Sequence, residues 1–162
     1  MAIFDTDFIQ GIVAENDARA KAEADARARS QEAAAQKRKR DDEIKRLVDQ
    51  ALREFPAAAQ QIGLEPFRVT YLGASPLMLK HHAKVWPVAS WYCIDKDGNT
   101  YTMDHMGAYE QWIKKAREGK EWVDKVDRQV VIDHIAFQTT ANIHGTLEES
   151  VRGMLAPYLR AR

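Results

Sequence analysis

Residues 88–105 read VASWYCIDKDGNTYTMDH, and the Asp97–Gly98 pair decides how this stretch folds. Asp-Gly is the pair that a two-residue type I′ hairpin turn demands, because both turn positions need a positive φ. The run from Val88 to Ile94 is apolar on both faces, and residues 100–105 follow as a return strand. We therefore predict a β-hairpin with a fixed register. Its paired residues are Ile94 with Tyr101, Tyr92 with Met103, and Cys93 with Thr102.

A shorter strand is predicted upstream of this hairpin. Phe67, Val69 and Tyr71 alternate with polar residues before Gly73, the pattern of a half-buried strand. The residues between this strand and Val88 contain Ser75, Pro76 and Pro87, and we expect them to be irregular.

Downstream, the sequence predicts helices at two places. Residues 109–116 have an amphipathic pattern, and Gly119 follows as a helix-ending residue. Thr146 and Glu149 form a capping box before a last helix that Gly153 and Pro157 should bend or shorten. Residues 122–143 fit either structure: the β-branched run from Val130 favours a strand, whereas the spacing of the valines would also suit a helix.

The hairpin is preceded by a helix with one apolar face. Ile44, Leu47, Val48, Ala51, Leu52 and Phe55 recur at helical spacing, which is typical of a helix that docks on a core. Pro56 either stops this helix or bends it into a short continuation, and Gly63 is a good residue to end it.

Residues 14–40 have a different character, because they contain no leucine, isoleucine, valine or aromatic residue. Acids precede bases by four residues along this alanine-rich segment, as in Glu15 and Arg19, the orientation that stabilises a single helix. A coiled-coil seam is absent, so we predict a solvated helix, with disorder as the alternative.

The N-terminal segment carries an apolar stripe ahead of this polar helix. Phe4, Phe8 and Ile12 are spaced at i, i+4 and i+8, and form one ridge if the segment is helical. Nothing in residues 14–40 could cover this ridge locally. We predict that it contacts a protein partner or another copy of the chain.

Together these patterns predict an α+β protein. Residues 1–40 form a polar N-terminal helical arm. Residues 41–162 form a compact domain, in which an antiparallel sheet is packed by amphipathic helices and residues 41–55 are the connecting helix.

Charge gives little indication of a nucleic-acid partner. The chain has 24 basic and 24 acidic residues, so its net charge is zero. Lys37, Arg38, Lys39 and Arg40 form a basic cluster that could bind phosphate, but acids at 41–43 follow at once and cancel most of its field. These four residues are a candidate partner-binding site, and nucleic acid remains the alternative partner.

No pattern predicts a catalytic residue, a cofactor or a metal site. Residues 95–99 imitate the start of a calcium loop, but Thr100 stands where that loop needs glycine, so a plain hairpin turn is expected. The histidines at 81, 82, 105, 134 and 144 lack any known metal-ligand spacing, and no serine has a nucleophile motif. A small metal-dependent hydrolase is therefore only a second alternative.

Two further features bear on compartment and partner. The single cysteine, Cys93, fits a reducing compartment and lies in an apolar run, so we expect a buried thiol in a cytoplasmic protein. No apolar run approaches the ~18 residues of a membrane span.

All four tryptophans fall within residues 86–122 beside several lysines, and this region is either core or a binding surface.

The leading hypothesis is therefore a non-enzymatic interaction or assembly protein. In it the arm reaches a partner and the α+β domain supplies a rigid docking body, as in a component of a phage or another multiprotein assembly. The first alternative is a nucleic-acid-binding accessory protein.

Overall fold

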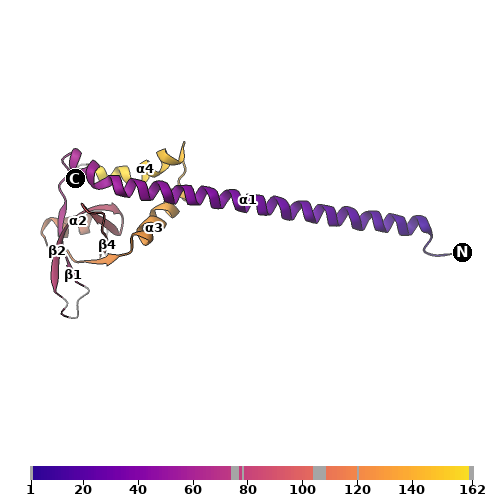
Figure 1. Ribbon diagram of the computed structural model, residues 1–162, viewed down its shortest axis with the longest axis horizontal. Helices are drawn as coiled ribbons and strands as arrows, with labels where there is room; N and C mark the ends of the chain where they lie inside the picture. The colour runs from indigo at the N-terminus through magenta and orange to yellow at the C-terminus, as the bar shows by residue number, and fades with distance from the viewer. Residues whose placement is uncertain (1, 74–76, 78, 104–108, 120, 161–162) are drawn as a thin grey trace. The chain divides into compact units, whose positions relative to one another are not determined.

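The structure, a computed structural model, describes residues 2–73, 77, 79–103, 109–119 and 121–160. The chain divides into two compact units, Met1–Arg40 and Asp41–Arg162. Its fold is α+β, a long N-terminal helix followed by a five-stranded antiparallel sheet with packed helices (Figure 1). The predicted fold class is confirmed.

Helix α1 spans Thr6–Gln61, and the side chain of Asp5 caps its N-terminus. The Asp5 carboxylate accepts a hydrogen bond from the Phe8 N–H at 2.8 Å, which satisfies one of the N–H groups that a helix leaves unpaired at its start. Up to Arg40 every described residue is exposed. The helix predicted for residues 14–40 is confirmed, and its alanine content favours a helix that has no buried face.

The second part of α1 has a buried face. Ile44, Leu47, Val48, Leu52 and Phe55 are all buried, as their spacing predicts. Pro56 does not stop the helix, which continues to Gln61. Gly63 then adopts a φ of +72°, and the Leu64 N–H bonds to the Ala59 carbonyl at 2.9 Å, so the helix ends in a left-handed cap where only glycine is unstrained.

The sheet is an antiparallel meander in the order β1-β2-β3-β4-β5. Its strands are β1 Phe67–Leu72, β2 Lys80–Ala89, β3 Tyr92–Asp95, β4 Thr100–Met103 and β5 Val123–Val126. The Thr70 N–H also bonds to the Glu121 carbonyl at 3.0 Å, and a single parallel bridge joins Thr70 to Trp122. The sheet is therefore curled, with the start of β5 returning to β1.

The register predicted for the β3–β4 hairpin is wrong by one residue. The observed pairs are Tyr92 with Thr102, Cys93 with Tyr101, and Ile94 with Thr100. The loop has three residues instead of two: Gly98 alone is left-handed, at a φ of +85°, and the Asp95 N–H bonds to the Asn99 carbonyl. The Asp95 carboxylate stabilises this longer loop by accepting from the N–H groups of Asp97 and Asn99, each at 2.9 Å.

The single strand expected over residues 88–94 is also wrong. Ser90 and Trp91 form a turn, and the chain reverses there between β2 and β3. Pro87 lies inside β2, opposite Cys93, and a register shift follows it. Pro87 comes after Val85, the last β2 residue that pairs with β1, so it has a strand on one side only and its missing N–H is tolerated.

Residues 122–143, which fitted either a strand or a helix, contain one of each. The strand is β5, and residues Arg128–Ala141 form helix α3. Asp127 caps α3 by accepting from the Gln129 N–H at 2.8 Å. The buried residues of α3 fall on one helical face (Val131, Ile132, Ile135, Ala136 and Thr139), whereas Phe137 is 77% exposed. Burial on a helical period thus outweighs the β-propensity of the valines.

The other two helices agree with their sequence patterns. Helix α2 spans Tyr109–Arg117 and is followed by Gly119 at a φ of +69°. Helix α4 spans Leu147–Leu159 and begins with the predicted capping box of Thr146 and Glu149. Pro157 lies within α4 without shortening it. Among the described residues, every helix is too short or too polar to cross a bilayer.

Alternation along the strands creates two separate cores. Cys93, Tyr101 and Met103 point to one face with Val69, Val85 and Val123, and α2 adds Trp112, Ile113 and Ala116. Trp86, Val88 and Ile94 point to the other face, where they pack with the second part of α1, with α3 and with α4. The sheet is therefore covered by helices on both faces.

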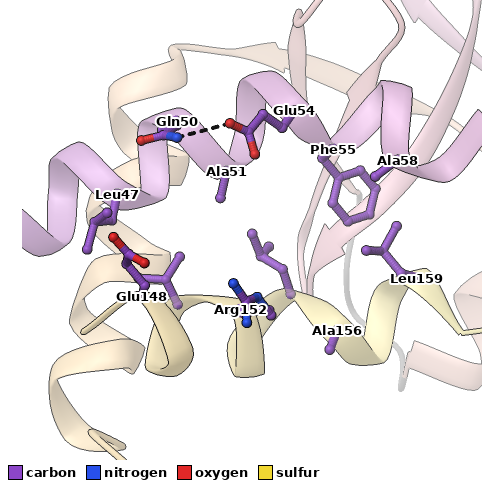
Figure 2. Close-up of a pocket in the computed structure, with 12 residues that line it drawn as sticks. Leu47, Gln50, Ala51, Glu54, Phe55, Ala58, Glu148, Arg152, Ala156 and Leu159 are labelled. Carbon is purple, nitrogen blue, oxygen red and sulfur yellow. Dashed lines mark hydrogen bonds between the residues drawn. The ribbon is translucent and has the colours of Figure 1, made fainter. Parts of the chain in front are cut away.

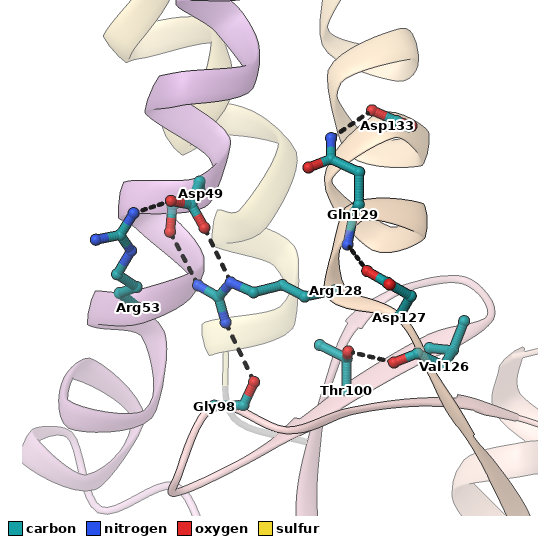
Figure 3. Close-up of polar contacts among 9 residues, drawn as sticks. All are labelled: Asp49, Arg53, Gly98, Thr100, Val126, Asp127, Arg128, Gln129 and Asp133. Atoms are coloured by element: carbon teal, nitrogen blue, oxygen red, sulfur yellow. Dashed lines mark hydrogen bonds and ion pairs between the residues drawn. The ribbon is translucent and has the colours of Figure 1, made fainter.

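Arg128 joins three elements at the edge of the helical layer (Figure 3). Its Nε donates to Asp49 Oδ1 at 2.9 Å and its Nη2 to the Asp49 carbonyl at 3.1 Å, while Nη1 donates to the Gly98 carbonyl at 3.2 Å. Arg53 also pairs with Asp49 from the next turn of α1. The guanidinium thus ties α3 to α1 and to the β3–β4 loop.

We predict that Arg128→Ala lowers the free energy of unfolding by about 2 kcal/mol, because the Asp49 carboxylate loses one of its two charged donors and the carbonyls of Asp49 and Gly98 lose theirs. Arg53→Ala is the matched control, since Arg53 contacts the same carboxylate but is 71% exposed, and its effect should be smaller. Urea unfolding of both variants measures this difference. Equal losses of the free energy of unfolding would show that the Arg128–Asp49 pair contributes no more than an exposed ion pair.

We also predict that Asp49 makes stability depend on acid pH. Arg53 first, and Arg128 after it, hold the pKa of the Asp49 carboxyl below its ordinary value. A carboxyl with a depressed pKa contributes stability above its unfolded pKa and loses it as the pH falls through the folded pKa. The wild type should therefore lose stability more steeply than Asp49→Asn below about pH 4. Parallel stability curves for the two proteins would contradict this.

Candidate functional site

The N-terminal ridge is fully accessible in the structure. Phe4, Phe8 and Ile12 are 66%, 51% and 42% exposed. Ile3, Ile9 and Val13 beside them are exposed as well. The ridge differs from the prediction in one respect, because Phe4 precedes the first helical residue. Its ring still lies against Phe8, with centroids 5.5 Å apart, so the apolar surface is continuous across the helix start.

The basic cluster Lys37–Arg40 lies on the same helix, and all four residues are exposed. Ridge and cluster are about 25 residues apart, or ~38 Å at 1.5 Å per residue. The structure therefore does not bring the two predicted binding sites together. Of the acids that follow the cluster, Glu43 pairs forward with Arg46 at 2.7 Å.

A groove between the second part of α1 and helix α4 was not foreseen (Figure 2). It has a volume of about 420 Å³. Its apolar lining comes from both helices: Leu47, Ala51, Phe55 and Ala58 from α1, and Val151, Leu155, Ala156 and Leu159 from α4. Ala51, Ala58 and Ala156 have small side chains that leave space between the two helices. Small residues within an apolar stripe are the sequence feature that could have predicted the groove.

Polar residues stand along the rim of this α1–α4 groove. Gln50 and Glu54 line it from α1 and are joined by a hydrogen bond of 3.0 Å. Glu148 and Arg152 line it from α4. An apolar floor with a polar rim is the usual composition of a surface that receives an apolar helix face.

A second groove of about 770 Å³ runs beside strand β2. It is lined by His82, Ala83 and Lys84 of β2, by Asp95, Lys96, Asp97 and Asn99 at the turn between β3 and β4, and by residues 60 and 63–66 at the end of α1 and before β1. Besides the two loop N–H groups, Asp95 accepts from Asn99 Nδ2 and from the Tyr101 hydroxyl, each at 3.0 Å. This carboxylate is therefore fully used in holding the hairpin.

The histidines do not assemble a catalytic or metal site within the described part of the chain. His134 lies among the rings of Trp91 and Tyr92, and burial lowers its pKa. His81 stacks on Tyr71, and His82 lies 3.2 Å from the Thr70 hydroxyl. No group of three potential metal ligands occurs among the described residues, which do not include His105.

Asp133 and His134 have separate surroundings although they are neighbours in sequence. Asp133 pairs with Lys45 at 3.3 Å and accepts from Gln129 at 2.9 Å, and these contacts hold its pKa below the ordinary value. The Asp133 carboxylate is therefore engaged by Lys45 and Gln129. Cys93 is fully buried, which raises the pKa of its thiol and makes it a poor nucleophile at neutral pH.

The tryptophans divide between core and surface. Trp86 and Trp112 are buried, and the Trp86 indole donates to the Leu64 carbonyl at 2.8 Å. Trp91 and Trp122 are 53% and 43% exposed. The ammonium of Lys80 lies 5.5 Å from the centre of the Trp122 ring. The aromatic-rich region is thus mainly core, with two rings left at the surface.

Comparison with protein-family models, with curated proteins and with solved structures finds no match for this chain. Its function must therefore be argued from its own surfaces.

We predict that Asp95→Ala lowers the free energy of unfolding by about 1–3 kcal/mol, because four donors lose their acceptor. Asp97→Ala changes a neighbouring, exposed loop acid and should cost under ~0.5 kcal/mol. Thermal and urea unfolding of the two variants measure the difference. If both variants match the wild type, the carboxylate does not hold the loop.

Proposed function

We propose that this chain is a non-enzymatic interaction or assembly protein. The observation that carries the proposal is the exposed apolar ridge of Phe4, Phe8 and Ile12 on a segment that has no core of its own. Contiguous exposed apolar surface of this kind marks sites of protein contact. Burying each ridge side chain would contribute about 1.5–3 kcal/mol before the costs of association.

The α1–α4 groove supports the same function from the compact domain. It exposes an apolar floor on two rigid helices, and rigid elements hold a binding surface in a fixed geometry. The domain can therefore serve as a docking body while the arm makes a separate contact. The partner is a protein or another copy of this chain.

The alternative, a nucleic-acid-binding accessory protein, has a weaker basis. The Lys37–Arg40 cluster is exposed, but the chain has no net positive charge to attract a polyanion. A metal-dependent hydrolase has less support still, because its histidines would have to act without an assembled ligand set among the described residues.

The test compares the wild type with a Phe4→Ala, Phe8→Ala double variant by light scattering across concentration and by pull-down. We predict that the double variant loses its partner or lowers its oligomeric mass. Its melting temperature should stay unchanged, because the proposal places the ridge in a contact with another molecule. Gln10→Ala, Asn16→Ala is the matched control, since it changes exposed polar residues on the same helix and should retain the wild-type partners.

Two outcomes would contradict the proposal. If the ridge variant keeps its mass and partners but melts at a lower temperature, the ridge packs within its own chain. If the partners disappear on nuclease treatment in the wild type and in both variants, the nucleic-acid alternative replaces the protein one.

A further inference from the structure

Strand β2 has one open edge over residues 80–84. It pairs with β1 from Lys80 to Val85, but its pairing with β3 begins only at Val85. Within the described part of the chain, the five residues before Val85 therefore have a neighbouring strand on one side only. An open edge presents unpaired N–H and C=O groups that can pair with another strand.

The direction of these groups follows from the hydrogen bonds of β1. In an antiparallel pair, residues alternate between those that bond to the partner strand and those that point away from it. The Thr70 N–H points away from β2, because it donates to Glu121. Its paired residue, His82, therefore points its own N–H and C=O away from β1, and so does Lys84 two residues later. Both residues present these groups to the open edge.

There is space beside this edge for another strand. The 770 Å³ groove is lined by His82, Ala83 and Lys84 and by the β3–β4 loop. In an antiparallel pair each residue faces one residue of the partner strand, so about five extended residues are needed to follow residues 80–84. The groove lies where β3 would continue if it were longer.

The charges on one face of this part of the sheet indicate which kind of strand would bind at the open edge. Six positions of β1 and β2 point to that face: Arg68, Thr70, Leu72, Lys80, His82 and Lys84. Three of them carry a positive charge, none is acidic, and the three basic residues are exposed. The groove itself is lined by three acids, Glu65, Asp95 and Asp97, against Lys84 and Lys96, so it adds no positive charge. The positive charge therefore comes from the sheet face.

A second copy of the same edge does not fit this surface. Two β2 edges paired antiparallel about His82 would place Lys80 of each copy opposite Lys84 of the other, and like charges opposite each other destabilise a strand pair. An acidic strand would instead place alternate carboxylates against these side chains. The exposed lysines thus oppose self-pairing and favour an acidic partner.

We propose that the open edge of β2 binds an extended acidic peptide segment by antiparallel strand addition. The peptide residues that bond to His82 and Lys84 lie directly opposite them and point to the same face of the sheet. The backbone N–H groups of the acidic residues therefore also donate the hydrogen bonds that join the peptide to β2. This site is separate from the N-terminal ridge and does not depend on it.

The probe is a fluorescent peptide of about eight residues that alternates glutamate and threonine, an ordinary strand length. Binding to the full chain is followed by fluorescence anisotropy. A peptide with lysine in place of glutamate should not bind. N-methylation of every glutamate amide should abolish binding, whereas N-methylation of every threonine amide should leave it intact, because only the first set faces β2.

Variants of the chain give the complementary test. Lys80→Glu, Lys84→Glu should weaken the acidic peptide roughly tenfold or more, because attraction becomes repulsion at two cross-strand positions. Arg152→Glu is the matched control, since it reverses one charge on α4 and should leave peptide binding unchanged. The Phe4→Ala, Phe8→Ala variant should also bind the peptide normally, which separates this site from the ridge.

Three results would overturn the proposal. The first is no saturable binding of the acidic peptide by the folded wild type. The second is equal binding of the glutamate-methylated and unmodified peptides, which would show that charge alone acts. The third is tighter binding of single-stranded oligothymidylate at the same lysines, which would assign this face to nucleic acid.

Discussion

The Asp95 carboxylate sets the register on which the rest of the domain depends. By accepting from the Asp97 and Asn99 N–H groups it stabilises a three-residue loop, and Asn99 and Tyr101 then use its remaining lone pairs. A loop one residue shorter would move every β4 side chain to the other face of the sheet. Tyr101 and Met103 would then leave the core that contains Cys93 and α2. Four hydrogen bonds at one buried acid thus determine what each face of the sheet can bury.

The helical layer depends on the same loop through Arg128. The guanidinium reaches the Gly98 carbonyl only because Gly98 adopts a left-handed conformation in the longer turn. Its other donors bind Asp49, so the loop, α1 and α3 are held at one point. This link fixes the second part of α1, one wall of the α1–α4 groove. The hairpin loop also lines the groove beside β2, so both grooves border elements that Asp95 and Arg128 hold.

Local patterns predicted the elements whose boundaries are set by neighbouring residues. The apolar face from Ile44 to Phe55, the cap at Gly63 and the capping box at Thr146 all depend on residues within one or two turns. The errors arose where tertiary contacts decide. Asp-Gly indicated a two-residue turn, because the spacing alone does not show that Asp95 will serve as an acceptor. The pattern of residues 122–143 left strand and helix open, because the β-propensity of the valines is local whereas the buried face of α3 is supplied by α1, α4 and β2.

The candidate binding surfaces divide in the same way into those set by neighbouring residues and those set by tertiary contacts. The ridge was predictable, because an apolar stripe ahead of 27 residues without a large apolar side chain has nothing nearby to cover it. The α1–α4 groove and the open edge of β2 were not, since each depends on how segments far apart in sequence meet. The edge exists because β3 stops at Asp95, where the carboxylate turns the chain into the loop, while β2 continues for five more residues beside β1. The same hydrogen bonds that fix the register therefore leave one edge of residues 80–84 open, and like charges on the lysines there disfavour pairing of that edge with its own copy.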